Sequence, residues 1–580
     1  MSFQTAPLAV TFKMGNAILS AVLPIVLTYF AALTTTELAA AFNGDETAGS
    51  RALTYVIITL VLGLANTVWS SIDTYIQGIL RYKVEAQVSD MMYERFLRLD
   101  FWRYDDKDTI DTYDKAQQFA RFYAYVFDRL ASVFSQLVGM VTAVIALFLV
   151  VPFVALVVII ALIPGVYIQF KLSRAQIGHW NKTVDVRRAQ RYIEWNLLQP
   201  QAIVELRLNN LIRHLLDLRR SYRDKDERER LNFEKKYIGQ QILSNVLESA
   251  AELTSLIWIT LQIIQRAQPL GQFIYVQQIV SRAIGSANSF VTTMSTIDED
   301  LAQLFDYQKF MDYPLQATGK KQLTATPEHI RLDNVSFHYY QAKEPVLKNI
   351  SLEIKRGQHV AIVGENGAGK STFVKLLLGL YAPTSGKLLL DNVKLGDYTI
   401  ESWHRQLSVL QQDFQQYNFT DIENNVYYGD VSSPIDKKRY ERAMQKSESR
   451  EFVSHLSKAD KTYPSTWMED ETGEKGVNLS GGQWQRIALG RSFYRDTPII
   501  ILDEPTSAID ALAEARIFKH LFADKGRTII TISHRLTTVE KADIIYVLKE
   551  GELIEQGTHN ELVNNGGDYV TIFADQLRHS

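Results

Sequence analysis

Long apolar runs alternate with charged stretches over the first half of the chain, whereas the part after about Thr326 is punctuated by glycines. A helix needs roughly 20 mostly apolar residues to cross a bilayer. Six runs meet or approach this length, and they predict six membrane-spanning helices. The runs are residues 17–42, 52–72, 130–150, 153–170, 242–264 and 271–294. The chain is therefore predicted to combine a helical membrane domain with a soluble domain.

Lysine and arginine set the predicted orientation, because basic residues concentrate in the cytoplasmic connections of membrane proteins. The connections 81–129 and 171–236 are dense in basic residues, while the other short loops carry almost none. Both long connections, and with them the C-terminal half, are expected in the cytoplasm. The connections are also rich in helix-forming residues, so the spanning helices should project well beyond the membrane.

Charged residues interrupt the last two apolar runs. Glu248 and Glu252 lie one helical turn apart on the same face, and Arg282 lies in the sixth run. Counted from the hairpin between the two runs, Glu252 and Arg282 reach similar depths, roughly 20 Å into the membrane, so an ion pair is feasible. Glu248 would then remain in a water-filled cavity. Two interpretations stay open: a structural role, or an acidic patch of the substrate cavity that attracts a cationic substrate.

The stretch VAIVGENGAGKST carries the first chemical motif of the soluble half. An apolar strand, the pattern GxxxxGK[ST] and a helical run follow one another, an order that aims main-chain N–H groups at phosphate oxygens. Lys370 would reach the β- and γ-phosphates of ATP, and Ser371 would offer its hydroxyl to Mg²⁺. The predicted nucleotide-contacting residues are Gly364, Glu365, Asn366, Gly367, Ala368, Gly369, Lys370, Ser371 and Thr372.

A second apolar strand, residues 499–502, ends in Asp503 and Glu504. Its unbroken apolar run is typical of a buried parallel strand. Phosphoryl transfer needs positioned groups and neutralised charge. Asp503 would accordingly hold the Mg²⁺ shell, and Glu504 would orient or deprotonate the attacking water.

A further turn of backbone donors lies in the run NLSGGQWQRIALGRS. Ser480, Gly481 and Gly482 form this turn at the start of a helix that begins near Gln483. A chain with a complete phosphate-binding loop needs no second turn for the same nucleotide. We therefore expect this turn to cover a nucleotide that another subunit holds.

With these motifs the sequence resembles an ATP-binding cassette (ABC) exporter half-transporter over nearly its whole length, and the LSGGQ run is close to diagnostic of the family. The resemblance implies a B-subfamily-like type IV fold. That fold is an α-helical polytopic membrane domain of six transmembrane helices, of the domain-swapped exporter type, plus an α/β P-loop nucleotide-binding domain. The implied division is 1–315 for the membrane domain, 316–326 for a linker and 327–580 for the nucleotide-binding domain.

The resemblance also implies roles for single residues in ATP binding and hydrolysis. Tyr339 matches the aromatic residue that stacks on adenine, with Tyr340 as the alternative. Gln412 matches the glutamine that contacts Mg²⁺ and senses the γ-phosphate, and His534 matches the histidine that touches the γ-phosphate. Catalysis is thus expected from Glu504, His534, Lys370 and Gln412, and metal binding from Ser371, Gln412 and Asp503.

Other implied features concern contacts between domains and subunits. Residues 507–510 match the loop that crosses the dimer interface, and Glu474 matches the acid of an exporter-specific segment. Short transverse helices that dock on the nucleotide-binding domains are expected around residues 105–113 and 196–206, the second on the partner subunit. These segments look most like those of peptide and lantibiotic exporters. Gln411 and Trp484 depart from the common family pattern without removing a catalytic group.

Composition narrows the remaining choices. The chain has no cysteine, which excludes disulfides, thiolate metal sites and cysteine catalysis. The absence of cysteine fits both a natural bacterial protein and an engineered one. The net charge of −3 offers no argument for a nucleic-acid partner. The first apolar run is longer than the apolar region of a signal peptide, so a retained span is expected. The segment before it is short, so an N-terminal amphipathic helix is expected to be shortened or absent.

One phosphate-binding loop and one LSGGQ turn per chain imply that two chains sandwich two nucleotides. Because all motifs are intact, a homodimer is favoured, with a heterodimer as the alternative. The predicted function is ATP-driven export across a bacterial cytoplasmic membrane by alternating access, in contact with membrane lipid. An ATP-gated channel or membrane sensor with the same architecture is the alternative. The transported substrate does not follow from these motifs.

Overall fold

The computed structural model describes residues 7–182, 184–199, 202–506, 508–523 and 526–578. The chain divides into two compact units. The first comprises Met1–Arg98 and Asp108–Tyr313, and the second comprises Leu99–Lys107 and Pro314–Ser580. The division at Tyr313 lies close to the expected domain boundary. The short segment Leu99–Lys107, which overlaps the first expected docking helix at residues 105–107, folds with the second unit.

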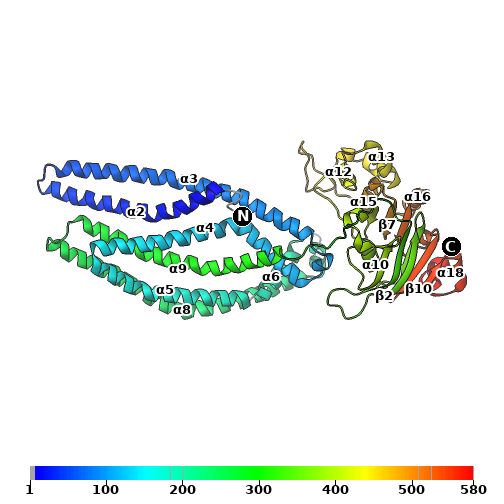
Figure 1. The fold of residues 1–580 in the computed structure, drawn as a ribbon, viewed down its shortest axis with the longest axis horizontal. Helices are drawn as coiled ribbons and strands as arrows, with labels where there is room; N and C mark the ends of the chain where they lie inside the picture. The colour runs from blue at the N-terminus through cyan, green and yellow to red at the C-terminus, as the bar shows by residue number, and fades with distance from the viewer. Residues whose placement is uncertain (1–6, 183, 200–201, 507, 524–525, 579–580) are drawn as a thin grey trace. The chain divides into compact units, whose positions relative to one another are not determined.

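Long helices build the first unit (Figure 1). In the part of the chain that the structure describes, each of the six apolar runs lies within one long helix, and the shorter helices α6 and α7 connect α5 to α8. Their bounds are α2 Pro7–Phe42, α3 Ala48–Leu97, α4 Lys107–Val150, α5 Pro152–Lys182, α6 Val184–Leu198, α7 Ala202–Leu208, α8 Leu211–Ile264 and α9 Gly271–Met311. Pro152 opens α5, where its missing N–H costs nothing, and so separates α5 from α4.

Five of these helices are long and apolar enough to cross a membrane, counted over the described residues: α2, α3, α4, α5 and α8. Helix α9 is long enough, but it lies outside this set. Its polar residues include Gln278, which accepts a hydrogen bond from Thr28 of α2, and Arg282, which donates to the Ser20 carbonyl of α2. The prediction of six long helices is thus confirmed for the elements, while the sixth span is less apolar than the other five. The chain is a multi-pass membrane protein.

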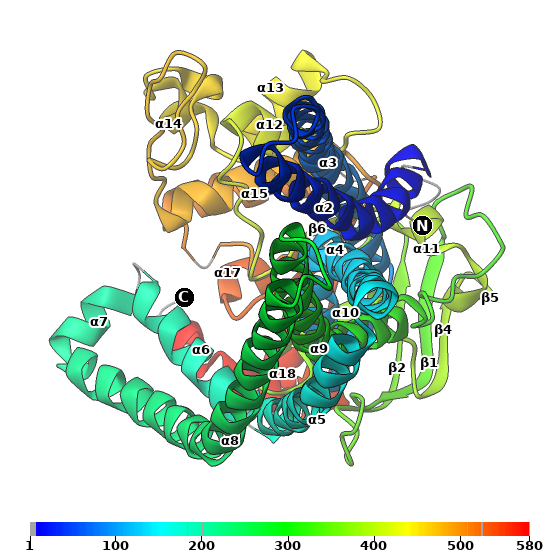
Figure 2. The same ribbon diagram turned by 90° about the vertical axis from the view of Figure 1, so that its left-hand side faces the viewer.

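Helix α9 packs against α2, α5 and α8, and Figure 2 shows these helices nearly end-on. Its fully buried face is made of small and β-branched residues, which let neighbouring helices approach closely. These residues are Val276, Ile279, Val280, Ala283 and Ala287. They join apolar residues of α4 and α5 in one core. The core of the membrane domain is therefore built in large part on the buried face of α9.

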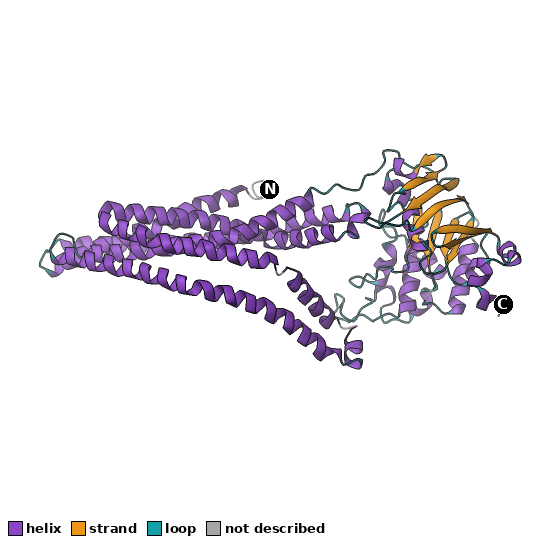
Figure 3. Cartoon of the chain, turned by 90° about the horizontal axis from the view of Figure 1, so that it is seen from below, coloured by secondary structure: helices purple, strands orange, loops and turns teal. Residues whose placement is uncertain are grey.

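The second unit contains the strands (Figure 3). An antiparallel sheet has the order β2-β1-β4-β5, with β1 His329–Phe337, β2 Leu347–Lys355, β4 Ser385–Leu390 and β5 Val393–Lys394. A second sheet has the order β10-β9-β3-β8-β7-β6. Its strands are β3 His359–Gly364, β6 Leu407–Leu410, β7 Ile499–Asp503, β8 Thr528–Ile532, β9 Ile544–Lys549 and β10 Glu552–Gly557.

Strands β3, β6, β7, β8 and β9 pair in parallel. Strand β7 is buried at every position, as its unbroken apolar run predicts. Because parallel strands end at the same edge, the residues after β3 and after β7 come close together with only β8 between them. This edge of the sheet is where the predicted chemistry converges.

The remaining elements of the second unit are short. Before the first sheet lies the 3-10 helix η1, Phe101–Tyr104. The others are α10 Lys370–Leu377, η2 Leu395–Asp397, α11 Ile400–His404, α12 Ile422–Tyr427, α13 Lys437–Lys446, α14 Arg450–Ser454, η3 Ala459–Lys461, α15 Gly481–Arg495, α16 Ala511–Phe522, α17 Leu536–Val539, α18 His559–Asn565, α19 Asp568–Ile572 and α20 Ala574–Leu577.

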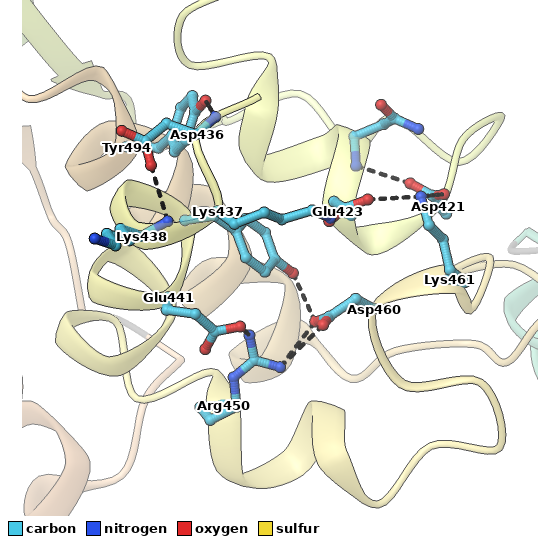
Figure 4. A network of polar contacts seen from close by, with 12 residues as sticks. Asp421, Glu423, Asp436, Lys437, Lys438, Glu441, Arg450, Asp460, Lys461 and Tyr494 are labelled. Carbon is cyan, nitrogen blue, oxygen red and sulfur yellow. Dashed lines mark hydrogen bonds and ion pairs between the residues drawn. The ribbon is translucent and has the colours of Figure 1, made fainter. Parts of the chain in front are cut away.

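A polar network fastens the short helices α12 to α14 to one another (Figure 4). The Tyr440 hydroxyl donates to Asp460 at 2.7 Å, and Arg450 donates to both oxygens of the same carboxylate at 2.9 and 3.1 Å. The buried Glu423 pairs with Lys437 and Lys461. Buried charges are tolerated when they are paired in this way. These short helices, whose apolar residues also join a hydrophobic core, are thereby held in a defined arrangement.

Candidate nucleotide site and charged residues of the membrane domain

The phosphate-binding loop connects β3 to the N-terminus of α10. Gly364, Gly367 and Gly369 have positive φ of 156°, 88° and 96°, a conformation that favours glycine. At Gly364 a Cβ would also overlap the carbonyl oxygen of Leu548. Lys370 Nζ donates to the carbonyls of Gly364 and Glu365 at 2.8 and 2.9 Å, so the lysine folds over the loop. Burial lowers the pKa of Lys370, while Glu504 and Asp503 oppose that shift.

Asp503 and Glu504 end β7 at the same edge of the sheet. Burial raises the pKa of Asp503 to about 6, and the neighbouring Glu504 adds to the shift. Glu504 adopts a φ of +49°, which is uncommon for a residue with a side chain. Its Oε1 lies 3.3 Å from Nδ1 of His534, so the structure brings these two predicted catalytic residues together. Two carboxylates beside a lysine are well suited to a divalent cation and a polyphosphate.

The loop that carries His534 is fastened from the C-terminal end of the chain. Gln576, on α20, donates to the His534 carbonyl at 2.9 Å and accepts from the Leu536 N–H at 2.7 Å. The imidazole itself remains largely exposed, with 62% of its side chain accessible. The main chain is thus held in place while the ring stays free to meet a phosphate.

Gln412 and Ser371 occupy exposed positions at this edge. Gln412 follows β6, and Ser371 is the second residue of α10. Their accessible side chains, together with Asp503, present the oxygen ligands that Mg²⁺ prefers. The donor set therefore fits the predicted metal ion.

The LSGGQ turn opens α15. Ser480 is the N-cap residue, and its side chain forms a capping box with Gln483, with N–O distances of 2.9 and 3.3 Å. Gly481 and Gly482 follow in the first turn, so main-chain N–H groups point outward from the helix. Ala508 packs against both glycines, whereas Ser507, the first residue of the predicted interface loop, lies outside the described residues.

Tyr339, the predicted adenine-stacking residue, lies beside the phosphate-binding loop. Its hydroxyl is 2.9 Å from the Thr372 hydroxyl, and its ring packs edge-on against Tyr381 at 5.5 Å. Tyr340, the alternative, instead packs against Trp102 at 4.4 Å. The two tyrosines therefore have different surroundings, and Tyr339 is the one that contacts the phosphate-binding loop.

Tyr381 links the nucleotide loop to the segment Leu99–Lys107. Its hydroxyl donates to Asp105, and its ring packs edge-on against Phe101 at 5.2 Å. Burial raises the pKa of Tyr381, with the Asp105 hydrogen bond adding to the shift, so the phenol stays protonated and can donate. Trp102 and the residues around Tyr381 line a cavity of about 750 Å³. No local sequence signal pointed to Tyr381.

Residues 105–113, where the first docking helix is expected, do not form a separate short helix. The short helix is η1, Phe101–Tyr104, whereas residues 108–113 already belong to the long helix α4. The second expected docking helix overlaps α7, Ala202–Leu208, while residues 200 and 201 of the prediction lie outside the described part. Glu474 pairs with Lys458 at 3.1 Å within its own chain.

The feasible ion pair between Glu252 and Arg282 does not form. Glu252 accepts a hydrogen bond from the Ser281 hydroxyl at 2.5 Å. Ser281 directly precedes Arg282, so the predicted depth of Glu252 along the helix pair is correct to within one residue. Adjacent residues of a helix point about 100° apart, however, and this rotation carries Arg282 to another face. There Arg282 donates to the carbonyls of Ser20 and Ala21 at 3.1 and 3.3 Å.

Glu248 is buried rather than exposed to an open cavity, with 6% of its surface accessible. It accepts from the Asn288 amide at 2.8 Å and from the Ser244 hydroxyl at 3.4 Å. Gly165 of α5 makes room for it, because a Cβ there would lie 2.5 Å from Glu248 Oε1. In the single chain, the carboxylate is thus enclosed by α5, α8 and α9.

Comparisons with known proteins agree with this fold and with these motifs. The family described as ABC transporter matches residues 347–507, which include the phosphate-binding loop, the LSGGQ turn and Glu504. A solved bacterial Atm1-family ABC exporter with ATP bound has the same fold, with a TM-score of 0.77 and 20% identity over 97% of this chain and 98% of the other. The match to residues 347–507 implies that this part of the chain binds ATP.

Curated relatives are named transporters. The chain is 40% identical over 263 residues to an ATP-dependent lipid A-core flippase of Nitrosococcus oceani, which covers 45% of this chain and 42% of the relative. It is 28% identical over 502 residues to a subtilin transport ATP-binding protein of Bacillus subtilis, covering 83% of this chain and 77% of the relative. The match with the flippases spans about half of their length.

Proposed function

We propose that this protein hydrolyses ATP to export a substrate across a bacterial cytoplasmic membrane. The observation that carries the proposal is the close approach of Glu504 and His534 beside Asp503 and Lys370, in a chain that also contains the helical membrane domain. The bacterial relatives named as flippase and subtilin transporter support the transport function and the location.

Within the proposed site each residue has a separate task. Lys370 leaves the two loop carbonyls to bind the β- and γ-phosphates, and Tyr339 stacks on adenine. Glu504 accepts a hydrogen bond from the attacking water and orients it, while His534 binds the γ-phosphate. Ser371, Gln412 and Asp503 would hold Mg²⁺, which would supply positive charge to neutralise the phosphates. Most of the catalysis then comes from positioning and charge stabilisation, as phosphoryl transfer requires.

A second copy of the chain completes each site. The LSGGQ turn is a set of main-chain hydrogen-bond donors. The nucleotide in the same chain's phosphate-binding loop does not need these donors, because that loop already supplies its own. Two copies arranged head to tail place each turn over the other chain's nucleotide. We infer a homodimer with two competent sites, because each motif is intact in this chain.

Mixed dimers test this arrangement directly. One chain carries Lys370→Ala and the other carries Gly482→Asp, with different affinity tags for purification of the mixed form. Each homodimer lacks both composite sites, whereas the mixed dimer keeps one. We expect ATPase activity to return in the mixed dimer to roughly half of the wild-type value or less. Absence of any recovery would contradict composite sites.

ATP binding closes the dimer because each nucleotide contacts both chains only in the closed state. Hydrolysis removes the shared γ-phosphate contacts and lets the dimer reopen. The segment Leu99–Lys107 folds with the nucleotide-binding unit yet leads directly into α3 and α4. We propose that it carries the closure to the spanning helices, which then alternate between inward-facing and outward-facing states.

The substrate cavity is proposed to include Glu248, Glu252 and Arg282. The structural role of Arg282 is supported by its bonds to α2. For Glu248, attraction of a cationic substrate requires the helices around it to separate during transport. Gln substitutions at Glu248 and Glu252 that leave stimulation by all cationic compounds unchanged would exclude this role.

A screen for compounds that stimulate the ATPase activity, followed by vesicle uptake, tests the overall function. Lipids and cationic peptides are the first compounds to include, because the named relatives handle a lipid and the peptide subtilin. A pump accumulates its substrate against a gradient while ATP is hydrolysed. Downhill flux alone would instead indicate an ATP-gated channel.

A further inference from the structure

Gln485, two residues after the LSGGQ run, is buried on α15 with 2% of its surface accessible. A buried amide needs hydrogen-bond partners, and the structure provides them on one loop. Its Nε2 donates to the main-chain carbonyl of Glu504 at 3.1 Å. Its Oε1 accepts from the main-chain N–H of Ala508 at 2.9 Å. The side chain therefore joins the helix of the LSGGQ turn to the loop that begins at the proposed catalytic carboxylate.

The main chain of Glu504 is held from both sides. Its N–H donates to the carbonyl of Ile532 at 3.0 Å, and its carbonyl accepts from Gln485. The residue lies in the left-handed region, with a φ of +49°. Such a conformation persists only where the surroundings hold it. Because the peptide planes set the direction of the side chain, the Gln485 bond helps to keep the Glu504 carboxylate beside His534.

The loop after Glu504 is also packed on the LSGGQ turn itself. A Cβ at Gly482 would lie 2.5 Å from the carbonyl oxygen of Ala508, so only glycine allows this approach. Arg486 forms an ion pair with Asp510 at 3.0 Å, one helical residue beyond Gln485. The LSGGQ turn and the loop 508–510 are thus connected by packing, by an ion pair and by the Gln485 amide.

We propose that Gln485 is a positioning residue that holds Glu504 for hydrolysis and ties it to the LSGGQ turn of the same chain. This inference rests on the proposed function, in which Glu504 serves the nucleotide of its own chain and the LSGGQ turn serves the partner's nucleotide. The two hydrogen bonds of one amide then connect the two sites of the dimer. Movement of the turn onto one nucleotide alters the position of the carboxylate at the other.

Two substitutions separate the contributions of the two bonds. Gln485→Leu keeps much of the side-chain volume and removes both bonds. Gln485→Glu retains an acceptor for the Ala508 N–H and removes the donor to the Glu504 carbonyl. Ser492→Ala is a matched control, because Ser492 is buried on the same helix and donates to the Val409 carbonyl at 3.2 Å, away from Glu504.

The measurements are kcat and KM for ATP hydrolysis, equilibrium ATP binding and the cooperativity of hydrolysis, all on the purified full-length protein. A misplaced catalytic group lowers the rate by about 10- to 100-fold. We expect this loss of kcat in both Gln485 variants, with ATP binding within about twofold of wild type. Cooperativity should fall in both Gln485 variants, because each lacks the bond to the Glu504 carbonyl, and Ser492→Ala should retain wild-type kinetics.

A kcat within twofold of wild type in either Gln485 variant overturns the inference. Parallel loss of ATP binding, kcat and thermal stability also overturns it, because such a pattern indicates a structural role. If Gln485→Leu does not fold, Gln485→Glu decides. Glu504→Gln is measured alongside: retained turnover in that variant contradicts the proposed function itself, whereas its loss together with unaffected Gln485 variants contradicts only the role of Gln485.

Discussion

Arg282 donates a hydrogen bond to the main-chain carbonyl of Ser20 at 3.1 Å, and Pro24 explains why that carbonyl is available. In a helix the carbonyl of residue 20 normally accepts from the N–H of residue 24, which proline lacks. Within a bilayer an unsatisfied carbonyl is costly. The arginine in α9 therefore satisfies a defect in α2, and the charge has a structural reason to lie there.

A double-mutant cycle tests this relationship. Arg282→Leu leaves the Ser20 carbonyl without its donor and should lower the free energy of unfolding by about 1–2 kcal/mol. In a Pro24→Ala background the helix supplies its own N–H, so the same substitution should cost clearly less. Denaturation in detergent or nanodiscs measures both values. Equal losses in the two backgrounds would show that Arg282 and Pro24 act independently.

Tyr381→Phe tests the link between the nucleotide loop and the segment Leu99–Lys107. The substitution removes the donor to Asp105 and keeps the ring contacts with Phe101 and Tyr339. A hydrogen bond to a charged group contributes about 1.5–3 kcal/mol. We expect the transport rate per ATP hydrolysed to fall several-fold, with basal hydrolysis nearly retained, and Asp105→Asn to have the same effect.

Tyr340→Phe is the matched control, since Tyr340 packs on Trp102 of the same segment through its ring. We expect the Tyr340→Phe variant to have the same transport rate per ATP hydrolysed as the wild type. If Tyr381→Phe is indistinguishable from this control, the Tyr381 hydroxyl has no part in coupling.

The pH dependence of Mg²⁺ activation follows from Asp503. Burial, followed by the charge of Glu504, raises its pKa to about 6, so the carboxyl takes up a proton as the pH falls through that value. A protonated carboxyl is a poor Mg²⁺ ligand. The Mg²⁺ concentration for half-maximal ATPase activity should therefore rise as the pH is lowered from about 7.5 to about 5.5.

Ser371→Ala serves as the comparison for this titration. It removes a metal ligand that does not titrate, so its Mg²⁺ requirement should be raised by a similar factor at every pH. A wild-type Mg²⁺ requirement that stays constant across the range would contradict the assignment of Asp503.

The motifs of the soluble half were predictable because their chemistry demands fixed spacings along the chain. The apolar strand before Asp503 and the glycines of 364–371 are local signals, and both lie where expected. Helices α2 to α5 and α8 were likewise predictable, because the length of an apolar run is itself the signal.

Contacts between distant segments were not predictable in the same way. The depth of Glu252 followed from counting residues, but the faces of two helices depend on how they rotate when they pack. The roles of Gln485 and Tyr381 depend on main-chain and side-chain partners 19 and 276 residues away. Pro24, four residues after Ser20, is a local signal, but it explains Arg282 only once α2 and α9 are known to pack together.

Glu504→Gln provides the most direct test of ATP-driven transport by this protein. The measurement compares ATP binding and phosphate release by the wild type and the variant in nanodiscs. The amide keeps the shape of the side chain and loses the negative charge that orients water, so ATP binding should be retained while phosphate release falls at least about 100-fold. Undiminished phosphate release by Glu504→Gln would contradict the account.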